Sequence, residues 1–491
     1  MNPLNSNTPS RRQLLARAGG GLGMLGLASL LHDKGLLETS AQAASGAGGP
    51  QIDANPLAAR KPHFSGKAKA VIWLFINGGP SHVDTFDYKP ELAKRDGQDI
   101  PGFDKNTGFF ANAVGGLMKS PFEFTQHGQC GKHVSSLFPN ISKHVDKMAF
   151  IHSLHTESNN HSPALFMIQS GLPRMGYPCV GSWVTYGLGC ESTNLPAFVV
   201  MSDPKGRGLP KGHAANWGAG FLPSVFQGTY LRPKGEPIDN LTRPAILNDD
   251  QQRAQLDLLK KLNARHFAQN EAENDLAARI ESFELAYRMQ TAAPEALDVD
   301  SEPANIKELY GLERPECAHF ARQCLTARRM VERGVRFVQI YSGGMDNQLS
   351  WDGHNDIAGN HGGFAKETDQ PIAALLEDLA QRGLLDSTLV IWGGEFGRLP
   401  IAQKAAKPGR DHNPHAFTHW LAGGGTKGGV SYGETDEIGH KAAVDKVTVN
   451  DLHATILHLL GLDHKKLTYV YNGRRFRLTD VAGEVIKPVL A

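Results

Sequence analysis

The sequence predicts an α/β protein whose mainly parallel sheet is covered by helices on both faces. Strand-like apolar runs alternate with helix-like segments along most of the chain, and this alternation is typical of parallel strands joined by crossover helices. Four of the apolar runs lead directly into polar segments that contain histidine or acidic residues. Because the carboxyl ends of parallel strands meet at one edge of a sheet, we expect these polar segments to converge there.

Six apolar runs predict the strands of the sheet. They are rich in β-branched and aromatic residues and are bounded by glycine or polar residues. They cover residues 68–77, 148–155, 195–201, 335–341, 388–392 and 417–425, the last of which includes a glycine turn.

Helices are predicted between these strands. A helix begins after Asn160, has a proline in its first turn and ends before Gly171. Further helices are expected over 317–333, 364–382 and 450–460. The charged segment 249–290, which has no glycine, predicts one long helix or a helix pair that leaves the core sheet.

The length and charge set limits on function. The 491 residues carry a net charge of +1 at pH 7, which indicates neither a nucleic-acid partner nor a membrane surface. This length suits one large α/β domain with insertions, or two domains. Histidine is frequent, at 21 residues, which is compatible with metal binding and equally with ordinary surface histidines.

Residues 1–43 are expected to be a twin-arginine signal peptide. Arg11 and Arg12 begin the pattern, a weakly apolar glycine-rich segment follows, and Ala41-Gln42-Ala43 supplies a small-x-small cleavage site. The apolar run is too short and too rich in glycine for a stable membrane span. We therefore expect the twin-arginine translocation machinery to export the folded protein, which would be periplasmic or secreted. The alternative is an ordinary basic tail.

Residues 44–66 are rich in alanine, glycine and proline and predict a linker. The folded domain is then expected over residues 67–491. Of the five cysteines, Cys179 and Cys190 could pair, and the odd number leaves at least one cysteine unpaired within the chain.

The strongest chemical signal is a set of acidic and histidine residues after two strands. Carboxylate and imidazole are the ligand types of Zn²⁺, Mn²⁺ and similar ions. Two acid–histidine pairs plus a further acid could hold one divalent ion, or two. These expected metal ligands are Asp352, His354, Glu395, Asp411 and His412. Taken singly, each pair could equally cap a helix or a turn.

Two further groups could complete the site. His82 and Asp84 follow the first strand, where either could ligate metal or shape the turn. Asn160, His161 and Ser162 stand at the start of a predicted helix, where free N–H groups favour an anion. His161 and Ser162 are the candidate catalytic residues, and Asn160 is a candidate substrate-binding residue. The alternative is a plain helix cap.

Two arginines flank the acidic and histidine residues. The guanidinium groups of Arg398 and Arg410 suit a tetrahedral oxyanion, so both are candidate substrate-binding residues. Surface ion pairs are the alternative role.

Taken together, the motifs GGPSHVDTFD, SNNHSPA, GGEFGR, GRDHNPH, GGGTKGG and DLHATILHLLG resemble the alkaline phosphatase and sulfatase superfamily. They are most similar to an exported branch of it, the domain-of-unknown-function family numbered fifteen-oh-one. The resemblance implies an alkaline-phosphatase-like fold from about Lys69 onward. It also implies a metal-dependent hydrolase of sulfate or phosphate esters, with one or two ions of zinc, manganese, calcium or magnesium.

This chain departs from the superfamily pattern at three positions. One is near Gly394, where the resemblance implies a strand-end aspartate and Glu395 could take its place. Asn77 stands where the first strand usually ends in a metal-binding aspartate, and His161 stands where the nucleophile is expected. The nucleophile is therefore left open between His161, Ser162 and water. The expected substrate is a small-molecule or glycan ester. The alternative is a catalytically inactive, sulfatase-like binding or scaffold protein.

Overall fold

The computed structural model describes residues 55–491 except 234, 239–240, 244–245, 270–273 and 346. The expected signal peptide and residues 44–54 of the expected linker lie outside the described residues. Within the described part of the chain, no helix is both long enough and apolar enough to cross a membrane.

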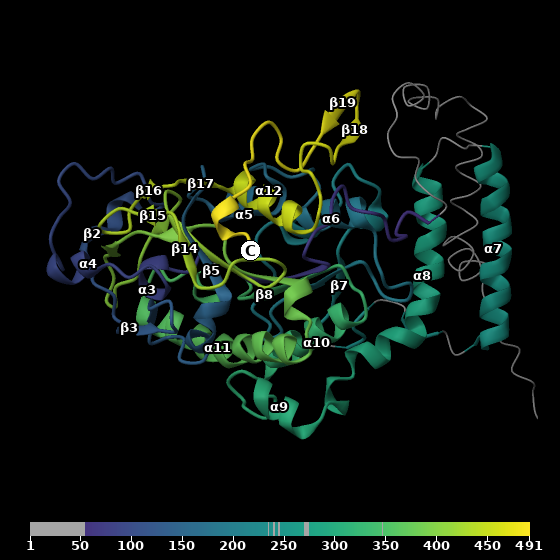
Figure 1. Cartoon of the computed structure of the whole chain (residues 1–491), viewed down its shortest axis with the longest axis horizontal. Helices are drawn as coiled ribbons and strands as arrows, with labels where there is room; N and C mark the ends of the chain where they lie inside the picture. Colours follow the sequence, from purple (N-terminus) through teal and green to yellow (C-terminus); the bar gives the residue numbers. More distant parts are fainter. Residues whose placement is uncertain (1–54, 234, 239–240, 244–245, 270–273, 346) are drawn as a thin grey trace, which may run out of the picture.

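A nine-stranded sheet forms the centre of the molecule (Figure 1). Its strand order is β14-β5-β13-β9-β1-β8-β6-β7, and β17 also pairs with β5. The strands are β1 (Ala70–Ile76), β5 (Met148–His155), β6 (Phe198–Met201), β7 (Thr229–Leu231), β8 (Phe337–Ser342), β9 (Thr388–Gly393), β13 (Phe417–Ala422), β14 (Val430–Tyr432) and β17 (Val447–Thr448). All six predicted strands are present in this sheet.

The sheet is mainly parallel, as predicted, and β13 is the exception. β13 runs antiparallel to both of its neighbours, β5 and β9, whereas β1 runs parallel to β8 and β9. β5 and β9 therefore point in the same direction, and both deliver their following residues to the same edge of the sheet.

Helices cover both faces of the sheet (Figure 1). The strand β1 is buried on both sides: Val71, Trp73 and Phe75 pack into one apolar cluster, and the alternating residues Ile72 and Leu74 pack into the other. The first cluster includes residues of α5 (His161–Ser170), α6 (Val180–Leu188) and α12 (Val449–Leu459). The second includes residues of α10 (Ala318–Glu332) and α11 (Ile357–Gln381).

The predicted helical excursion is confirmed as a helix pair. The helices α7 (Asp249–Gln269) and α8 (Asn274–Leu297) lie beside one another and extend away from the sheet (Figure 1). The Arg253 guanidinium joins them by donating to both carboxylate oxygens of Glu284, at 2.9 and 3.2 Å. The short helix α9 (Ala304–Tyr310) then leads back to the body of the molecule.

The helix α11 begins earlier than the sequence pattern indicates. It starts at Ile357 and runs through Gly362 and Gly363. The Asp356 side chain caps its start by accepting a hydrogen bond from the Gly359 N–H at 3.1 Å. This cap and the packing of the helix outweigh the low helix propensity of glycine.

Several short elements lie around the sheet and were not predicted. The helices are α3 (His82–Thr85) and α4 (Pro90–Lys94). The paired strands are β2 (Val114–Leu117) with β11 (Ile401–Gln403), β3 (Phe124–His127) with β4 (Lys132–Ser135), β10 (Gly397–Arg398) with β12 (His412–Asn413), β15 (Glu434–Thr435) with β16 (Ala442–Val444), and β18 (Tyr469–Tyr471) with β19 (Arg474–Phe476).

The suggested pairing of Cys179 with Cys190 is wrong, because all five cysteines are free thiols in the structure. Helix α6 separates the two residues, and its nine residues span about 14 Å. A disulfide requires Cα atoms within about 7 Å. The Cys190 thiol instead donates to the Gly334 carbonyl at 3.2 Å.

Candidate metal centre

Most of the predicted site residues meet at one edge of the sheet, in the segments that follow β5, β8 and β9. His161 is the first residue of α5, six positions after the end of β5. Asp352 and His354 lie in the loop after β8, and His412 lies in the short β10–β12 ribbon beyond β9. We call the set His161, Asp352, His354, Asp411 and His412 the central cluster.

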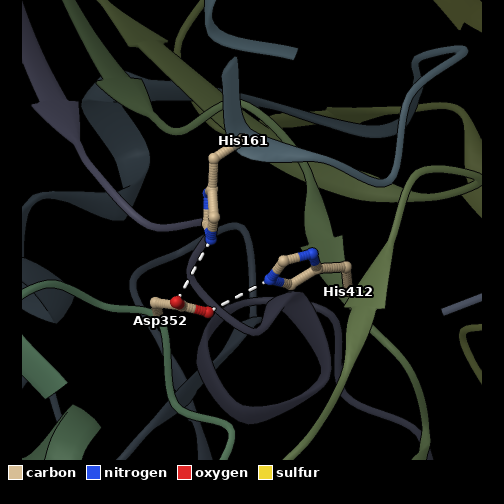
Figure 2. Close-up of side chains that lie close together, drawn as sticks. All are labelled: His161, Asp352 and His412. Carbon is tan, nitrogen blue, oxygen red and sulfur yellow. Dashed lines mark hydrogen bonds and ion pairs between the residues drawn. The ribbon is translucent and has the colours of Figure 1, made fainter. Parts of the chain in front are cut away.

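The side chains of the central cluster are buried and point toward one another. Figure 2 shows the rings of His161 and His412 aimed at the two oxygens of Asp352. His161 Nε2 lies 3.2 Å from Asp352 Oδ2, and His412 Nε2 lies 3.1 Å from Asp352 Oδ1. His354 Nε2 lies 2.9 Å from Asp352 Oδ1 and 2.9 Å from His412 Nε2. Asp411 Oδ1 is 3.7 Å from His354 Nδ1.

The outer ring nitrogens determine which tautomers are present. His412 Nδ1 lies 2.6 Å from the backbone carbonyl oxygen of Asn159, which only accepts, so Nδ1 carries the hydrogen. His354 Nδ1 likewise donates to Gln403 Oε1 at 2.6 Å. In the neutral rings both Nε2 atoms therefore present lone pairs, and both face the same carboxylate oxygen. Acceptors this close together are stabilised when a proton or a cation lies among them.

Glu395 supports His161 from the outer side. Its Oε1 accepts from His161 Nδ1 at 2.7 Å, and it also accepts from the Gly78 N–H at 3.1 Å. His161 Nε2 has no hydrogen-bond partner among the described residues although Asp352 lies beside it. The sequence predicts Glu395 as a metal ligand; the structure places it behind a histidine, where it orients the ring.

The electrostatics of the cluster follow from burial and close contact. Burial lowers the pKa of His161, but the close contact with the Asp352 carboxylate and the hydrogen bond to Glu395 outweigh it and raise the pKa to about 9. Burial and the neighbouring His161 hold the pKa of His412 well below its ordinary value. Burial raises the pKa of the Asp352 carboxyl, yet the Arg398 guanidinium and the histidines bring it below its ordinary value. The cluster thus combines an ionised carboxylate with a neutral His412 ring.

The two candidate substrate-binding arginines are engaged inside the protein. The guanidinium of Arg398 donates to Asp352 Oδ1 at 2.7 Å and to the carbonyl oxygens of Gly78 and Gly79. Arg410 forms a bidentate pair with Asp84, at 2.6 and 3.0 Å. Both arginines are fully buried, so neither guanidinium is presented to a substrate. They stabilise the loops that carry the cluster.

Two predicted residues after β1, Asp84 and His82, also lie outside the cluster. Asp84 is occupied by Arg410 and by the Ser81 hydroxyl, which donates to it at 2.6 Å. His82 Nε2 faces the Gly439 carbonyl oxygen at 2.7 Å. The Asn77 amide donates to the Gly344 carbonyl oxygen. The structure thus gives Asp84 and His82 partners other than the cluster.

The predicted helix start at Asn160 is present. Its side chain accepts from the Ser162 N–H at 3.3 Å and so caps α5. Ser162 is half-buried in the first turn, next to His161. This places a hydroxyl and the positive end of a ten-residue helix beside the cluster.

A loop that sequence reasoning did not single out covers the cluster. Asp411 Oδ2 accepts from the Phe110 N–H at 2.6 Å, and the Asn159 amide donates to the Gly108 carbonyl oxygen at 2.8 Å. The Phe110 ring meets His354 edge-on at 4.9 Å between centroids, and the Phe109 ring lies 5.7 Å from His412. We call residues 107–110 the cover loop. The adjacent residues Phe109 and Phe110 are visible in the sequence, but their position along the chain does not indicate that they lie beside the cluster.

The residues present fit a divalent ion. Two triplets each bring one ligand atom per residue within 4.8 Å of the others: His161, Asp352 and His412, and His354, Asp411 and His412. In a tetrahedral zinc site with bonds of about 2.0–2.1 Å, neighbouring ligand atoms lie roughly 3.3 Å apart. The spacings of 2.9, 3.1 and 3.2 Å in the cluster approach this value. The Nε2 atom of His161, which has no hydrogen-bond partner among the described residues, is a further atom that could ligate such an ion. These buried groups could therefore hold one or more metal ions.

Comparison with solved structures found matches with low sequence identity. The lipoteichoic acid synthase LtaP from Listeria monocytogenes is 8% identical over 87% of this chain and 79% of that one, with a TM-score of 0.35. The PsFucS1 sulfatase from Pseudoalteromonas sp. is 12% identical over 82% and 68%, with a TM-score of 0.34. The alkaline phosphatase from the Antarctic bacterium TAB5 is 10% identical over 80% and 98%, with a TM-score of 0.31. No curated protein matches the sequence.

A family model matches almost the whole folded part of the chain, in agreement with the motif-based resemblance. The match covers residues 68–490, which includes every residue of the central cluster. The chain belongs to the family described as Protein of unknown function (DUF1501).

Proposed function

We propose that this protein is a metal-dependent hydrolase of sulfate or phosphate esters. The observation that carries the proposal is the convergence of three imidazole Nε2 atoms on the Asp352 carboxylate, at 2.9–3.2 Å. Structural ion pairs do not require three histidines around one carboxylate, whereas metal sites in hydrolases do use such donors.

The ion would be held by the five residues of the central cluster. A histidine-rich set favours Zn²⁺ over Mn²⁺, Ca²⁺ or Mg²⁺. When bound, the ion supplies positive charge that lowers the pKa of a water molecule and neutralises an oxyanion. The chain itself fixes the ring orientations: Glu395 holds His161, and the Asn159 carbonyl holds His412.

The arrangement favours Ser162 or water as the nucleophile rather than His161. His161 Nδ1 is bonded to Glu395 and its Nε2 faces Asp352, so neither nitrogen is free to attack. Ser162 lies in the first turn of α5, where backbone N–H groups stabilise an anion. The variant Ser162→Ala distinguishes the two nucleophiles. If Ser162 attacks, the variant should lose kcat; if water attacks, its kcat should stay near normal.

The direct test combines metal analysis with ester assays. Purified protein is analysed for bound metal by mass spectrometry and assayed with aryl sulfates and aryl phosphates. His412→Ala and Asp411→Ala should lose both metal and turnover. The control His415→Ala changes an exposed histidine three positions from His412 and should retain both. Absence of metal from the unmodified protein, after growth with added Zn²⁺ and Mn²⁺, would refute the proposal.

A second candidate function is a binding or scaffold protein without turnover. Its support is that the cover loop lies over the cluster and that both flanking arginines are used internally. Stoichiometric metal with no hydrolysis across a broad panel of sulfate and phosphate esters would favour this second function. A glycan ester that is hydrolysed only after Phe110→Ala would instead show an enzyme closed by its loop.

We also propose that the chain is exported by the twin-arginine route. The support is the Arg11-Arg12 pair with the cleavage pattern at residues 41–43. Replacement of both arginines by lysine should leave the protein in the cytoplasm, as cell fractionation would show. Unchanged export of this variant would contradict the proposal.

A further inference from the structure

A cavity of about 420 Å³ lies away from the central cluster, at the β5–β14 edge of the sheet. Its volume is in the range of pockets for small molecules. None of the central cluster residues lines it. The lining includes Lys132 from β4, His152 from β5 and Ser431 from β14, together with the aromatic residues Tyr88 and Phe150.

Lys132 is the unusual group in this cavity. Its side chain is half-buried, and its described hydrogen-bond partners are neutral: His152 Nε2 at 2.5 Å and Ser431 Oγ at 3.2 Å. The amine also lies 4.5 Å above the centre of the Phe150 ring. Lysines withdrawn from water are usually paired with a carboxylate, and withdrawal from water is one of the ways in which a lysine amine becomes nucleophilic.

His152 is fixed so that it remains a neutral partner. Its Nδ1 lies 3.1 Å from the Thr418 hydroxyl on β13, and burial holds its pKa well below the ordinary value. Burial also lowers the pKa of Lys132, to about 8. At pH 7 about a tenth of such amines are neutral, roughly 200–300 times the fraction of an ordinary lysine.

The remaining walls select against an anionic ligand. Asp87, Glu434 and Asp445 line the same cavity, and Asp87 is already paired with Lys89 at 3.2 Å. Acidic groups at the walls oppose a second carboxylate or a sulfate. The Tyr88 ring stacks on His133 at 4.8 Å and offers an aromatic wall. The cavity is therefore suited to a small molecule without negative charge, and its aromatic walls can contact an apolar part of that molecule.

We infer that Lys132 is a reactive amine that binds a small aldehyde or ketone as an imine, at a site distinct from the central cluster. The neutral Nζ attacks the carbonyl carbon, and the carbonyl π electrons move to the oxygen. The ammonium has first released one proton to water; after the attack a second proton passes from Nζ to the oxygen, which gives the neutral carbinolamine. Its hydroxyl then takes back the released proton and leaves as water while the nitrogen lone pair forms the C=N bond. Starting from the ammonium form, the products are the protonated imine and one water molecule, so charge and protons balance.

The test is reductive trapping with a defined probe. The full chain is incubated with benzaldehyde and cyanoborohydride at pH 7, and modified lysines are located by peptide mass spectrometry. We expect Lys132 to be labelled at least tenfold faster than Lys119, an exposed lysine whose side chain is 62% accessible. The variant Lys132→Arg keeps the charge and should lose the single fast-reacting site, whereas Lys119→Arg should keep it.

Two results would overturn the inference. Labelling of Lys132 no faster than Lys119 in a protein with an unchanged circular dichroism spectrum would show an ordinary amine. Protection of Lys132 by excess sulfate, with sulfate also binding to Lys132→Arg in calorimetry, would show an anion site instead. Neither result depends on metal in the central cluster, so this inference and the proposed hydrolase activity fail or stand separately.

Discussion

Replacing Glu395 with glutamine tests how the central cluster is organised. Glu395 accepts from His161 Nδ1 at 2.7 Å and from the Gly78 N–H at 3.1 Å. Glutamine has nearly the same volume, and its amide oxygen can still accept from both donors, but it lacks the negative charge that strengthens these hydrogen bonds. Loss of a carboxylate partner behind a metal-bound histidine typically reduces metal affinity about 10–100-fold, which corresponds to about 1.4–2.7 kcal/mol.

The affinity is measured by competition with a chromophoric chelator for Zn²⁺. The control Glu437→Gln changes an exposed acid outside the cluster and should leave the affinity unchanged. An unchanged affinity in Glu395→Gln would refute the orienting role. A loss as large as that in His412→Ala would also refute it, because Glu395 would then be a direct ligand, as the sequence alone suggests.

Three further changes test other parts of the structure. Asp84→Ala leaves the buried Arg410 guanidinium without its bidentate partner, so the free energy of unfolding in urea should fall by about 3–5 kcal/mol; a loss below 1 kcal/mol would contradict the pairing. Phe110→Ala removes the ring that meets His354 edge-on, so a chelator should extract the metal several-fold faster, whereas Phe64→Ala should not change the rate. Burial raises the pKa of Glu367, but Arg207 and its other cationic partners lower it further, so it lies below the ordinary value. The contribution of Glu367 to stability is therefore complete above the unfolded pKa of about 4.3 and is lost as the pH falls below it. Glu367→Gln should flatten this part of the stability curve, and an unchanged slope would count against the ion pairs at Glu367.

The sheet was predictable because its signals are local. Continuous apolar runs such as 70–76 and 388–393 are buried on both faces, and their composition alone identifies them. The direction of β13 was not predictable, because its six residues carry the same apolar pattern as a parallel strand. Its orientation depends on pairing with β5 and β9, which are distant in the sequence.

The candidate site was predictable by residue type but not by role. Asp352, His354 and His412 were identified because acidic and histidine residues follow strand ends. Residue type also selected Asp84 and Arg410, which pair with each other, and Arg398, which donates to Asp352 and to backbone carbonyls. Contacts between residues far apart in the sequence decide whether an acid faces a histidine or an arginine. Arg410 and Asp84, for example, are 326 positions apart. No pattern within one segment contains that information.

The position of β13 in the sheet has a consequence for how the protein folds. β5 leads to His161 and β9 leads to Glu395, residues that are 234 positions apart in the chain. The strand between β5 and β9 is β13, which is synthesised after both of them. A nascent chain that ends before Phe417 already contains every residue of the central cluster but lacks the strand that sets β5 in register with β9. The register between β5 and β9 is therefore complete only once β13 has been synthesised, and pairing strands so distant in the sequence carries a large cost of loop closure.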